Sequence, residues 1–170
     1  MEHSALPEIC IRSAQASDAG TIIESINSVC AEEIYLQTDR YIPNAQWESA
    51  LHHPESVPDH LILVAESRNK IIGIINVFPG VNSKDNHTAD LGIHVVAEYR
   101  NQGIGTRLMQ NALDWSLARG YKKITLSAFA TNARAIHLYK KFGFVHEGVR
   151  RQQFRVHGEY VDDVLMAKFF

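Results

Sequence analysis

The segment YRNQGIGTRLMQNALDW, residues 99–115, places Gly103 and Gly105 directly before a pattern typical of an amphipathic helix. Glycine is a poor helix former, so its position where a helix begins needs a physical reason. The first N–H groups of a helix lack intrahelical partners, and together with the helix dipole they form an anion site. Residues without a Cβ let a phosphate approach that backbone, and Arg100 and Arg107 add positive charge. The segment therefore predicts a phosphate-binding loop, with a plain strand-to-helix turn as the alternative.

Two known phosphate loops do not fit the same residues. A Walker A loop requires Lys and then Ser or Thr after its last glycine, whereas Thr106 and Arg107 follow Gly105. A dinucleotide fingerprint requires a third glycine where Leu108 stands, and an acidic residue about twenty positions further on. The segment TLSAFATNAR, residues 125–134, contains no acidic residue. Both nucleotide-binding interpretations are therefore set aside.

The composition favours one globular domain over residues 1–170. The chain has 170 residues, of which 45% are hydrophobic, and a net charge of −2. This length suffices for a single core, and the balanced charge gives no reason to expect nucleic acid or an anionic membrane as partner. No apolar run reaches the roughly 18 residues of a membrane span, and the first ten residues lack a signal-peptide pattern. We therefore expect a cytoplasmic protein.

The cysteines and histidines suggest neither a disulfide nor a metal site. Cys10 and Cys30 are too few for a disulfide framework, and each stands in an otherwise apolar segment, so both are predicted to be buried. Nine histidines are many, but their spacings match no metal-ligand pattern.

The hydrophobic periodicity predicts a mixed α/β chain. Alternating apolar residues predict strands, and apolar residues at helical spacing predict helices, with Ser17 and Asp18 as the cap of the first helix. An Asn69-Lys70 turn links the second and third strands, and Gly120 ends the helix that follows the glycines. The expected strands are 8–14, 60–67, 71–80, 87–97, 122–130, 144–156 and 159–170, and the expected helices are 16–32, a short one at 45–51, the one after Gly105, and 132–143.

The sequence resembles the GNAT superfamily of N-acetyltransferases. Arg100-x-x-Gly103-x-Gly105, between a strand and a helix, is similar to the acyl-CoA signature of that family, and ATNARAIHLYKKFGF, residues 130–144, is similar to its second signature. The resemblance extends from about residue 9 to the C-terminus. It implies an α/β (α+β mixed) fold, with a twisted mixed sheet of about seven strands flanked by helices and a splayed parallel strand pair. It also implies acetyl-CoA as cosubstrate.

The resemblance also assigns roles to individual residues. Tyr139 matches the general acid that protonates the departing CoA thiolate, and Asn132 matches a residue near the thioester or the pantetheine arm. The backbone of three strand residues would pair with the pantetheine arm, and seven residues of the loop would surround the pyrophosphate. The strand residues are His94, Val95 and Val96, and the loop residues are Arg100, Asn101, Gln102, Gly103, Ile104, Gly105 and Thr106.

The general base is less well specified. Better-known members carry a glutamate on the strand before the phosphate loop, at odd offsets upstream of the residue that matches Arg100. Those offsets hold Ala89 and His87 here, so the usual glutamate is absent and His87 is the nearest candidate. Asp90 and His94 lie on the opposite face of the strand unless a bulge reverses it, and an ordered water is a further alternative.

The acceptor is expected to be a small amine, a free amino acid or a peptide N-terminus. In the family, the first helix, the following loop and the final hairpin usually build the acceptor pocket. Three acidic residues there could attract an ammonium group, and three arginines could hold a carboxylate. A non-catalytic acetyl-CoA sensor is the alternative function, and dimers are frequent among similar proteins. The acidic residues are Glu32, Glu33 and Asp39, and the arginines are Arg150, Arg151 and Arg155.

Overall fold

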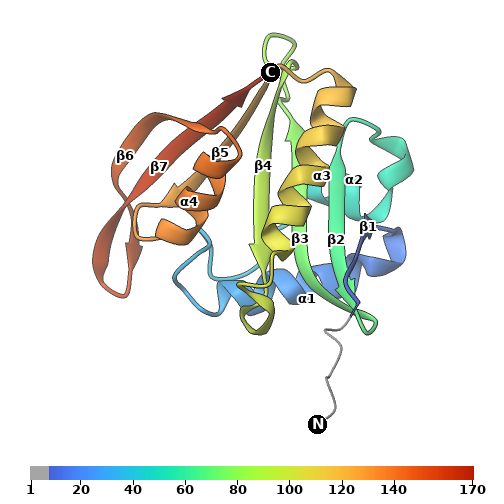
Figure 1. Cartoon of the computed structure of the whole chain (residues 1–170), viewed down its shortest axis with the longest axis horizontal. Helices are drawn as coiled ribbons and strands as arrows, with labels where there is room; N and C mark the ends of the chain where they lie inside the picture. The colour runs from blue at the N-terminus through green and yellow to red at the C-terminus, as the bar shows by residue number, and fades with distance from the viewer. Residues whose placement is uncertain (1–7) are drawn as a thin grey trace.

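A seven-stranded sheet in the order β1-β2-β3-β4-β5-β7-β6 organises the molecule (Figure 1). The computed structural model describes residues 8–170. All neighbouring strands are antiparallel except β4 and β5, which run parallel. The expected mixed α/β fold with seven strands is confirmed. The strands are β1 (Cys10–Ser13), β2 (Leu61–Ser67), β3 (Lys70–Pro79), β4 (Thr88–Val95), β5 (Lys123–Phe129), β6 (Val145–Val156) and β7 (Glu159–Phe169).

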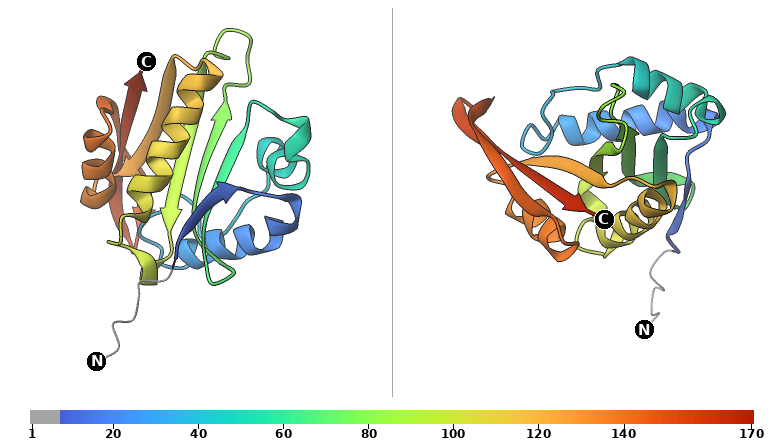
Figure 2. Two further views of the ribbon diagram at one scale, coloured as in Figure 1. Left: turned by 45° about the vertical axis from the view of Figure 1, so that its right-hand side comes forward. Right: turned by 90° about the horizontal axis from the view of Figure 1, so that it is seen from above.

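Helices cover both faces of the sheet (Figures 1 and 2). On one face, α3 and α4 close a core with the strands around Leu91, Leu126 and Met166. On the other face, α1 and α2 pack on Val64, Ile74 and neighbouring apolar residues. The helices are α1 (Ala19–Cys30), α2 (Ala45–His52), α3 (Ile104–Arg119) and α4 (Ala133–Lys141), with short 3-10 turns η1 (Ala16–Asp18), η2 (Pro54–Ser56) and η3 (Ala97–Tyr99).

Helix α3 begins and ends at glycines in the left-handed region. Gly103 caps its N-terminus with φ 78°, and Gly120 caps its C-terminus with φ 91°. Other residues adopt such torsions only with strain, so both ends of α3 are fixed by local sequence. The predicted stop at Gly120 is confirmed.

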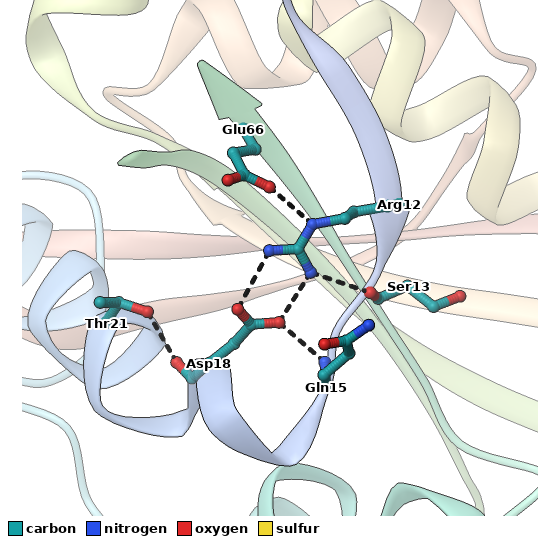
Figure 3. A network of polar contacts seen from close by, with 6 residues as sticks. All are labelled: Arg12, Ser13, Gln15, Asp18, Thr21 and Glu66. Carbon is teal, nitrogen blue, oxygen red and sulfur yellow. Dashed lines mark hydrogen bonds and ion pairs between the residues drawn. The ribbon is translucent and has the colours of Figure 1, made fainter. Parts of the chain in front are cut away.

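The sequence predicts that Asp18 caps α1, but its carboxylate forms hydrogen bonds with other groups instead. Asp18 is the N-cap residue of α1 but makes no side-chain cap hydrogen bond. Arg12 of β1 instead donates two hydrogen bonds to it, at 2.7 and 3.0 Å, and the Gln15 amide donates a third at 2.8 Å (Figure 3). Arg12 also donates to Glu66 of β2 at 2.6 Å. This network ties β1, η1 and β2 together.

Two smaller expectations were wrong. Cys30 is buried, but Cys10 is exposed. Cys10 lies on β1, which is the edge strand of the sheet and leaves this side chain uncovered. The turn before β3 is formed by Arg68 and Asn69, both with positive φ, while Lys70 already belongs to the strand.

Candidate active site

The centre of the site is the point where β4 and β5 separate. The two strands pair only over Thr88–Asp90 and Lys123–Thr125, and beyond those residues they diverge (Figure 1). The facing edges therefore offer backbone N–H and C=O groups that do not pair across the gap, and such groups require partners. An extended ligand with amide groups would supply them.

Asp90 is the last residue of β4 that pairs with β5. Its carboxylate accepts a hydrogen bond from the Thr125 hydroxyl at 3.0 Å. The surrounding protein raises the pKa of the Asp90 carboxyl by desolvation, although the side chain remains accessible to solvent, and the Thr125 hydrogen bond and the charge of Arg150 act in the opposite direction. An accessible carboxylate with a raised pKa is suited to accept a proton.

Tyr139 lies on α4, in the core on the α3/α4 face of the sheet. Its ring is 6% exposed and packs near Phe144, with ring centroids 6.0 Å apart. Burial raises the pKa of the Tyr139 phenol, and the nearby charge of Asp90 raises it further, so the two groups lie within electrostatic range. Within residues 8–170, the hydroxyl makes no hydrogen bond to a protein group. Tyr139 thus keeps its proton and has a free donor.

His87 lies away from this arrangement. It precedes β4 in an exposed turn, and its carbonyl accepts from the Lys122 amide at 2.9 Å, at the end where the strands are still paired. The β3–β4 register is continuous, so no bulge reverses the faces of β4. Ala89 is buried against the core, whereas Asp90 is on the opposite face. His87 therefore lies at the paired end of the two strands, and not at the end where they separate.

His94 is on the same face as Asp90 but is chemically unsuited to take protons. Its Nε2 lies 2.9 Å from the Ser25 hydroxyl of α1. Burial, assisted by the charge of Arg100, lowers the pKa of His94 to about 4, so the ring is neutral near pH 7. A group with so low a pKa is a poor base at neutral pH.

The backbone of residues 94–96 is partly engaged within the protein. The Val95 carbonyl accepts from Arg100 Nε at 2.8 Å, and the Val96 amide donates to Ile72 at 3.0 Å. A ligand in the gap would therefore pair with the remaining groups of this segment.

The loop before α3 offers free amide groups to an anion. Gly103 receives no side-chain cap, and the first intrahelical bond runs from the Arg107 amide to the Gly103 carbonyl at 3.1 Å. The amides of Ile104, Gly105 and Thr106 precede that bond, so they have no intrahelical acceptor. Before them, Asn101 has φ 62°, and the Gln102 side chain donates to the Glu98 carbonyl at 3.2 Å.

The two glycines differ in backbone conformation and in surroundings. Gly103 requires its positive φ, and a Cβ there would have open space around it. At Gly105, a Cβ would lie 3.4 Å from the Leu138 side chain of α4. A Cβ at Gly105 would therefore be in ordinary van der Waals contact with α4, the helix that carries Tyr139.

Both arginines near the loop have protein partners. Arg100 forms a two-pronged ion pair with Glu32 at 2.7 and 2.6 Å, and its guanidinium lies 4.6 Å from the centre of the Tyr35 ring. Arg107 donates to the Ile9 carbonyl at 3.0 Å. The positive end of α3, rather than these side chains, is thus the free anion-binding feature.

Asn132 has a structural role at the start of α4. Its side-chain oxygen accepts from the Ala135 amide at 3.2 Å, which caps the helix that carries Tyr139. Its side-chain nitrogen remains available to a ligand.

A parallel strand pair that separates beside a glycine-led helix agrees with the expectation from the sequence, and comparison with known proteins decides the family. Residues 22–144 match the model of the acetyltransferase (GNAT) family. The chain belongs to the GNAT acetyltransferase family. It is an acetyl-CoA-dependent N-acetyltransferase, as expected.

Individual GNAT relatives match most of the chain. L-amino acid N-acetyltransferase AaaT of Escherichia coli is 30% identical over 171 residues, which cover 96% of this chain and 99% of that protein. The structure of a GNAT acetyltransferase from Streptococcus pneumoniae has a TM-score of 0.87 at 30% identity and covers 96% of this chain and 100% of that one. A spermidine N(1)-acetyltransferase of Vibrio cholerae is 28% identical over 65% of this GNAT chain and 63% of its own length.

Two further findings describe residues 8–170 of the GNAT enzyme. None of their helices combines the length and apolar character that a bilayer crossing requires. The same residues contain no group of three or more His, Cys, Asp or Glu side chains placed to hold a metal ion.

Proposed function

We propose that this enzyme transfers the acetyl group of acetyl-CoA to a primary amine by direct attack, with Asp90 as general base and Tyr139 as general acid. Two observations carry the proposal. Asp90 lies at the point where β4 and β5 separate, and its charge acts on the buried Tyr139 phenol. His87, the base suggested by the sequence, is replaced in this proposal because it lies outside β4.

The cosubstrate would bind between the strands and at the start of α3. The amides of residues 104–106 would hold the pyrophosphate, since they are free and at the positive end of the helix dipole. Main-chain groups of residues 94–96 and the Asn132 amide nitrogen would pair with the pantetheine arm. This route leads the thioester to the gap beside Asp90 and Tyr139.

Asp90 answers the first chemical requirement. A primary amine with a pKa of about 10.4 is almost wholly protonated at pH 7, and deprotonating it costs roughly 4–5 kcal/mol. Asp90 would accept this proton directly or through one water. The free amine would then attack the acetyl carbonyl carbon to give a tetrahedral intermediate.

Tyr139 answers the second requirement. When the intermediate collapses, the C–S bond breaks and the sulfur leaves with the electron pair. The Tyr139 hydroxyl would give its proton to that sulfur, because the hydroxyl is protonated and has no protein acceptor within residues 8–170. The attacking nitrogen, which is positively charged in the intermediate, would lose its second proton to solvent to give the amide. The proton that Asp90 received would return through solvent to the Tyr139 phenolate, so that both groups regain their starting protonation.

A free amino acid is the acceptor class best supported by the relatives. The AaaT relative is named as an L-amino acid N-acetyltransferase and matches nearly the whole chain. A cavity of about 490 Å³ between the loop after α1 and the β6–β7 hairpin would hold part of the acceptor. Its apolar lining includes Leu36, Phe129 and Phe154, and charged residues such as Glu33 and Arg155 lie around them.

The test is thiol release from acetyl-CoA with a panel of amino acids, polyamines and short peptides, measured against a blank without acceptor. Acceptor-dependent release that falls in Asp90→Asn and Tyr139→Phe would support the proposal. Binding of CoA without release for any acceptor would favour the sensor function instead.

A further inference from the structure

Asp163 of β7 is a buried carboxylate without hydrogen bonds. Its side chain is 0% exposed, and neither oxygen has a hydrogen-bond partner within residues 8–170. Its nearest cation is Arg150 of β6, whose Nη1 lies 3.8 Å from Oδ2. A buried charge is tolerated only when an opposite charge compensates it. The Arg150 guanidinium therefore lies beside a carboxylate that solvent cannot reach.

Arg150 lies beside Asp163 and on the same face of the sheet as Asp90. Its side chain is 53% exposed, and its backbone is opposite Asp163 in the β6–β7 register. Its charge lowers the pKa of the Asp90 carboxyl, so the guanidinium is within electrostatic range of that group. No ion pair joins Arg150 to Asp90 in the described part of the chain. The strand registers place both side chains on one face of the sheet. Asp90 is opposite Thr125 of β5, Phe129 follows four residues further along β5, and Phe129 and Arg150 are both opposite Asp163.

The other two arginines of this hairpin differ from Arg150. Arg151 and Arg155 are exposed, and neither forms an ion pair with the residues that the structure describes. Only Arg150, of the three, has a buried carboxylate behind it, and this restricts where its guanidinium can go.

We propose that Arg150, positioned by Asp163, binds the carboxylate of the acceptor while Asp90 receives its amine. This proposal rests on the proposed function, since it uses Asp90 as the base. An α-amino acid carries its ammonium and carboxylate groups on the same carbon and therefore needs an anion and a cation side by side. The guanidinium fork matches a carboxylate with two parallel hydrogen bonds. A polyamine has no carboxylate, and a peptide N-terminus has an amide at that position.

Asp163 is a positioning residue in this arrangement. It is fully buried, so the acceptor cannot touch it, and it acts only through Arg150. Phe129, which lines the cavity, is opposite Asp163 in the β5–β7 register. The side chain of the acceptor would therefore enter an apolar part of the cavity, which makes L-phenylalanine a suitable probe.

The experiment compares L-phenylalanine with its amide as acceptors, by thiol release at neutral pH. The amide keeps the amine and the side chain but lacks the negative charge. The wild type should prefer the free acid, and Arg150→Ala should raise the KM for the acid by about 10- to 100-fold, which is the loss expected for hydrogen bonds to a charged group. Arg150→Lys should recover part of this loss.

Asp163→Asn tests the positioning role. The variant should raise the KM for the acid several-fold with little change in kcat, and should lower the acid-to-amide ratio of kcat/KM. Arg119→Ala is the matched control, because Arg119 also pairs with an aspartate, Asp59, but far from the site. If Asp163→Asn does not fold, the two Arg150 variants still decide the proposal.

The outcomes separate this inference from the proposed function. Two results would overturn the proposal that Arg150 binds the acceptor carboxylate. One is an equal kcat/KM for the acid and the amide in the wild type, and the other is an unchanged acid-to-amide ratio of kcat/KM in Arg150→Ala. Turnover of spermidine or a short peptide, but of no amino acid, would also overturn it and leave the proposed function standing. Failure of every tested acceptor to cause thiol release would overturn both proposals.

Discussion

At the scale of single residues, the raised pKa of Asp90 allows its effect on kcat to be measured without a loss of stability. Its pKa is raised in the folded protein, so folding favours the protonated form. The stabilising contribution is present at low pH and lost as the pH rises, which means that the ionised carboxylate does not stabilise the fold at pH 7. Asp90→Asn should therefore lower kcat by about 10²- to 10³-fold with an equal or higher Tm.

Steady-state kinetics and thermal melts at pH 7 check this prediction. Asp85→Asn is the matched control, since Asp85 is in the exposed turn before β4, where Asn82 is its hydrogen-bond partner, and kcat should not change. An unchanged kcat in Asp90→Asn would exclude Asp90 as the base. His87→Ala measured in parallel would then show whether the exposed histidine has that role.

The pH dependence of kcat/KM should report the same carboxyl group. Activity should fall as the pH decreases through the raised pKa of Asp90, because the protonated acid cannot accept a proton. His94 does not contribute to this limb in the range above about pH 4, where burial keeps it neutral. Arg150 and Tyr139, which interact electrostatically with Asp90, do not change their charge at acid pH. A limb that persists in Asp90→Asn would contradict the assignment.

Tyr139→Phe should lower kcat by about 10²-fold and leave the Kd for acetyl-CoA nearly intact. The hydroxyl has no protein partner within residues 8–170, so its removal leaves no unpaired group and the free energy of unfolding should change by less than about 1 kcal/mol. Kinetics, calorimetric binding and denaturant unfolding measure the three quantities. Equal turnover in the two proteins would remove Tyr139 from the mechanism.

At the scale of one element, the two ends of α3 provide an internal comparison. Gly103 and Gly120 have φ values of 78° and 91°, and a Cβ at either position meets no atom within 4 Å. Replacing either by Ala should cost about 1–2 kcal/mol of stability through backbone strain alone. Only Gly103→Ala should also weaken acetyl-CoA binding, because it disturbs the free amides at the N-terminus of α3.

Urea unfolding and calorimetric titration with CoA distinguish the two effects. Gly120→Ala is the control, with the same strain and no nearby ligand group. The anion-binding role of the α3 N-terminus would be refuted by a CoA affinity that is the same in both variants.

At the scale of the whole molecule, Asp18 shows the opposite electrostatic behaviour to Asp90. Hydrogen bonds from Arg12 lower the pKa of the Asp18 carboxyl, and the same guanidinium joins β1, η1 and β2 (Figure 3). This stabilisation is present above the unfolded pKa and is lost as the pH falls through the lower folded pKa. Asp18→Asn should destabilise the fold by about 1–2 kcal/mol at pH 7, and the difference from wild type should shrink below about pH 4.

Denaturant unfolding at pH 7 and pH 3 measures this difference, and kcat should be unaffected because the network lies at the β1 edge of the sheet. A difference that is independent of pH would show that the carboxylate charge is not the stabilising feature.

Local sequence determined much of the fold. Local apolar patterns and turn residues predicted all seven strands, and the glycines predicted both ends of α3, since these signals depend on neighbouring residues. The phosphate-binding expectation for residues 103–106 depends on the same local features. Tyr139 was found through a motif that is continuous in the sequence.

Only the tertiary structure decided which polar groups meet. The local sequence does not show that Glu32 forms an ion pair with Arg100, 68 residues away. It also does not show that the Asp18 carboxylate binds Arg12 instead of capping the helix. Asp162 and Asp163 are neighbours in the sequence, yet only Asp163 is fully buried, and it lies beside Arg150. The physical reason is that strand periodicity fixes two alternating faces, whereas the packing of α1 and α3 against the sheet decides what each face meets.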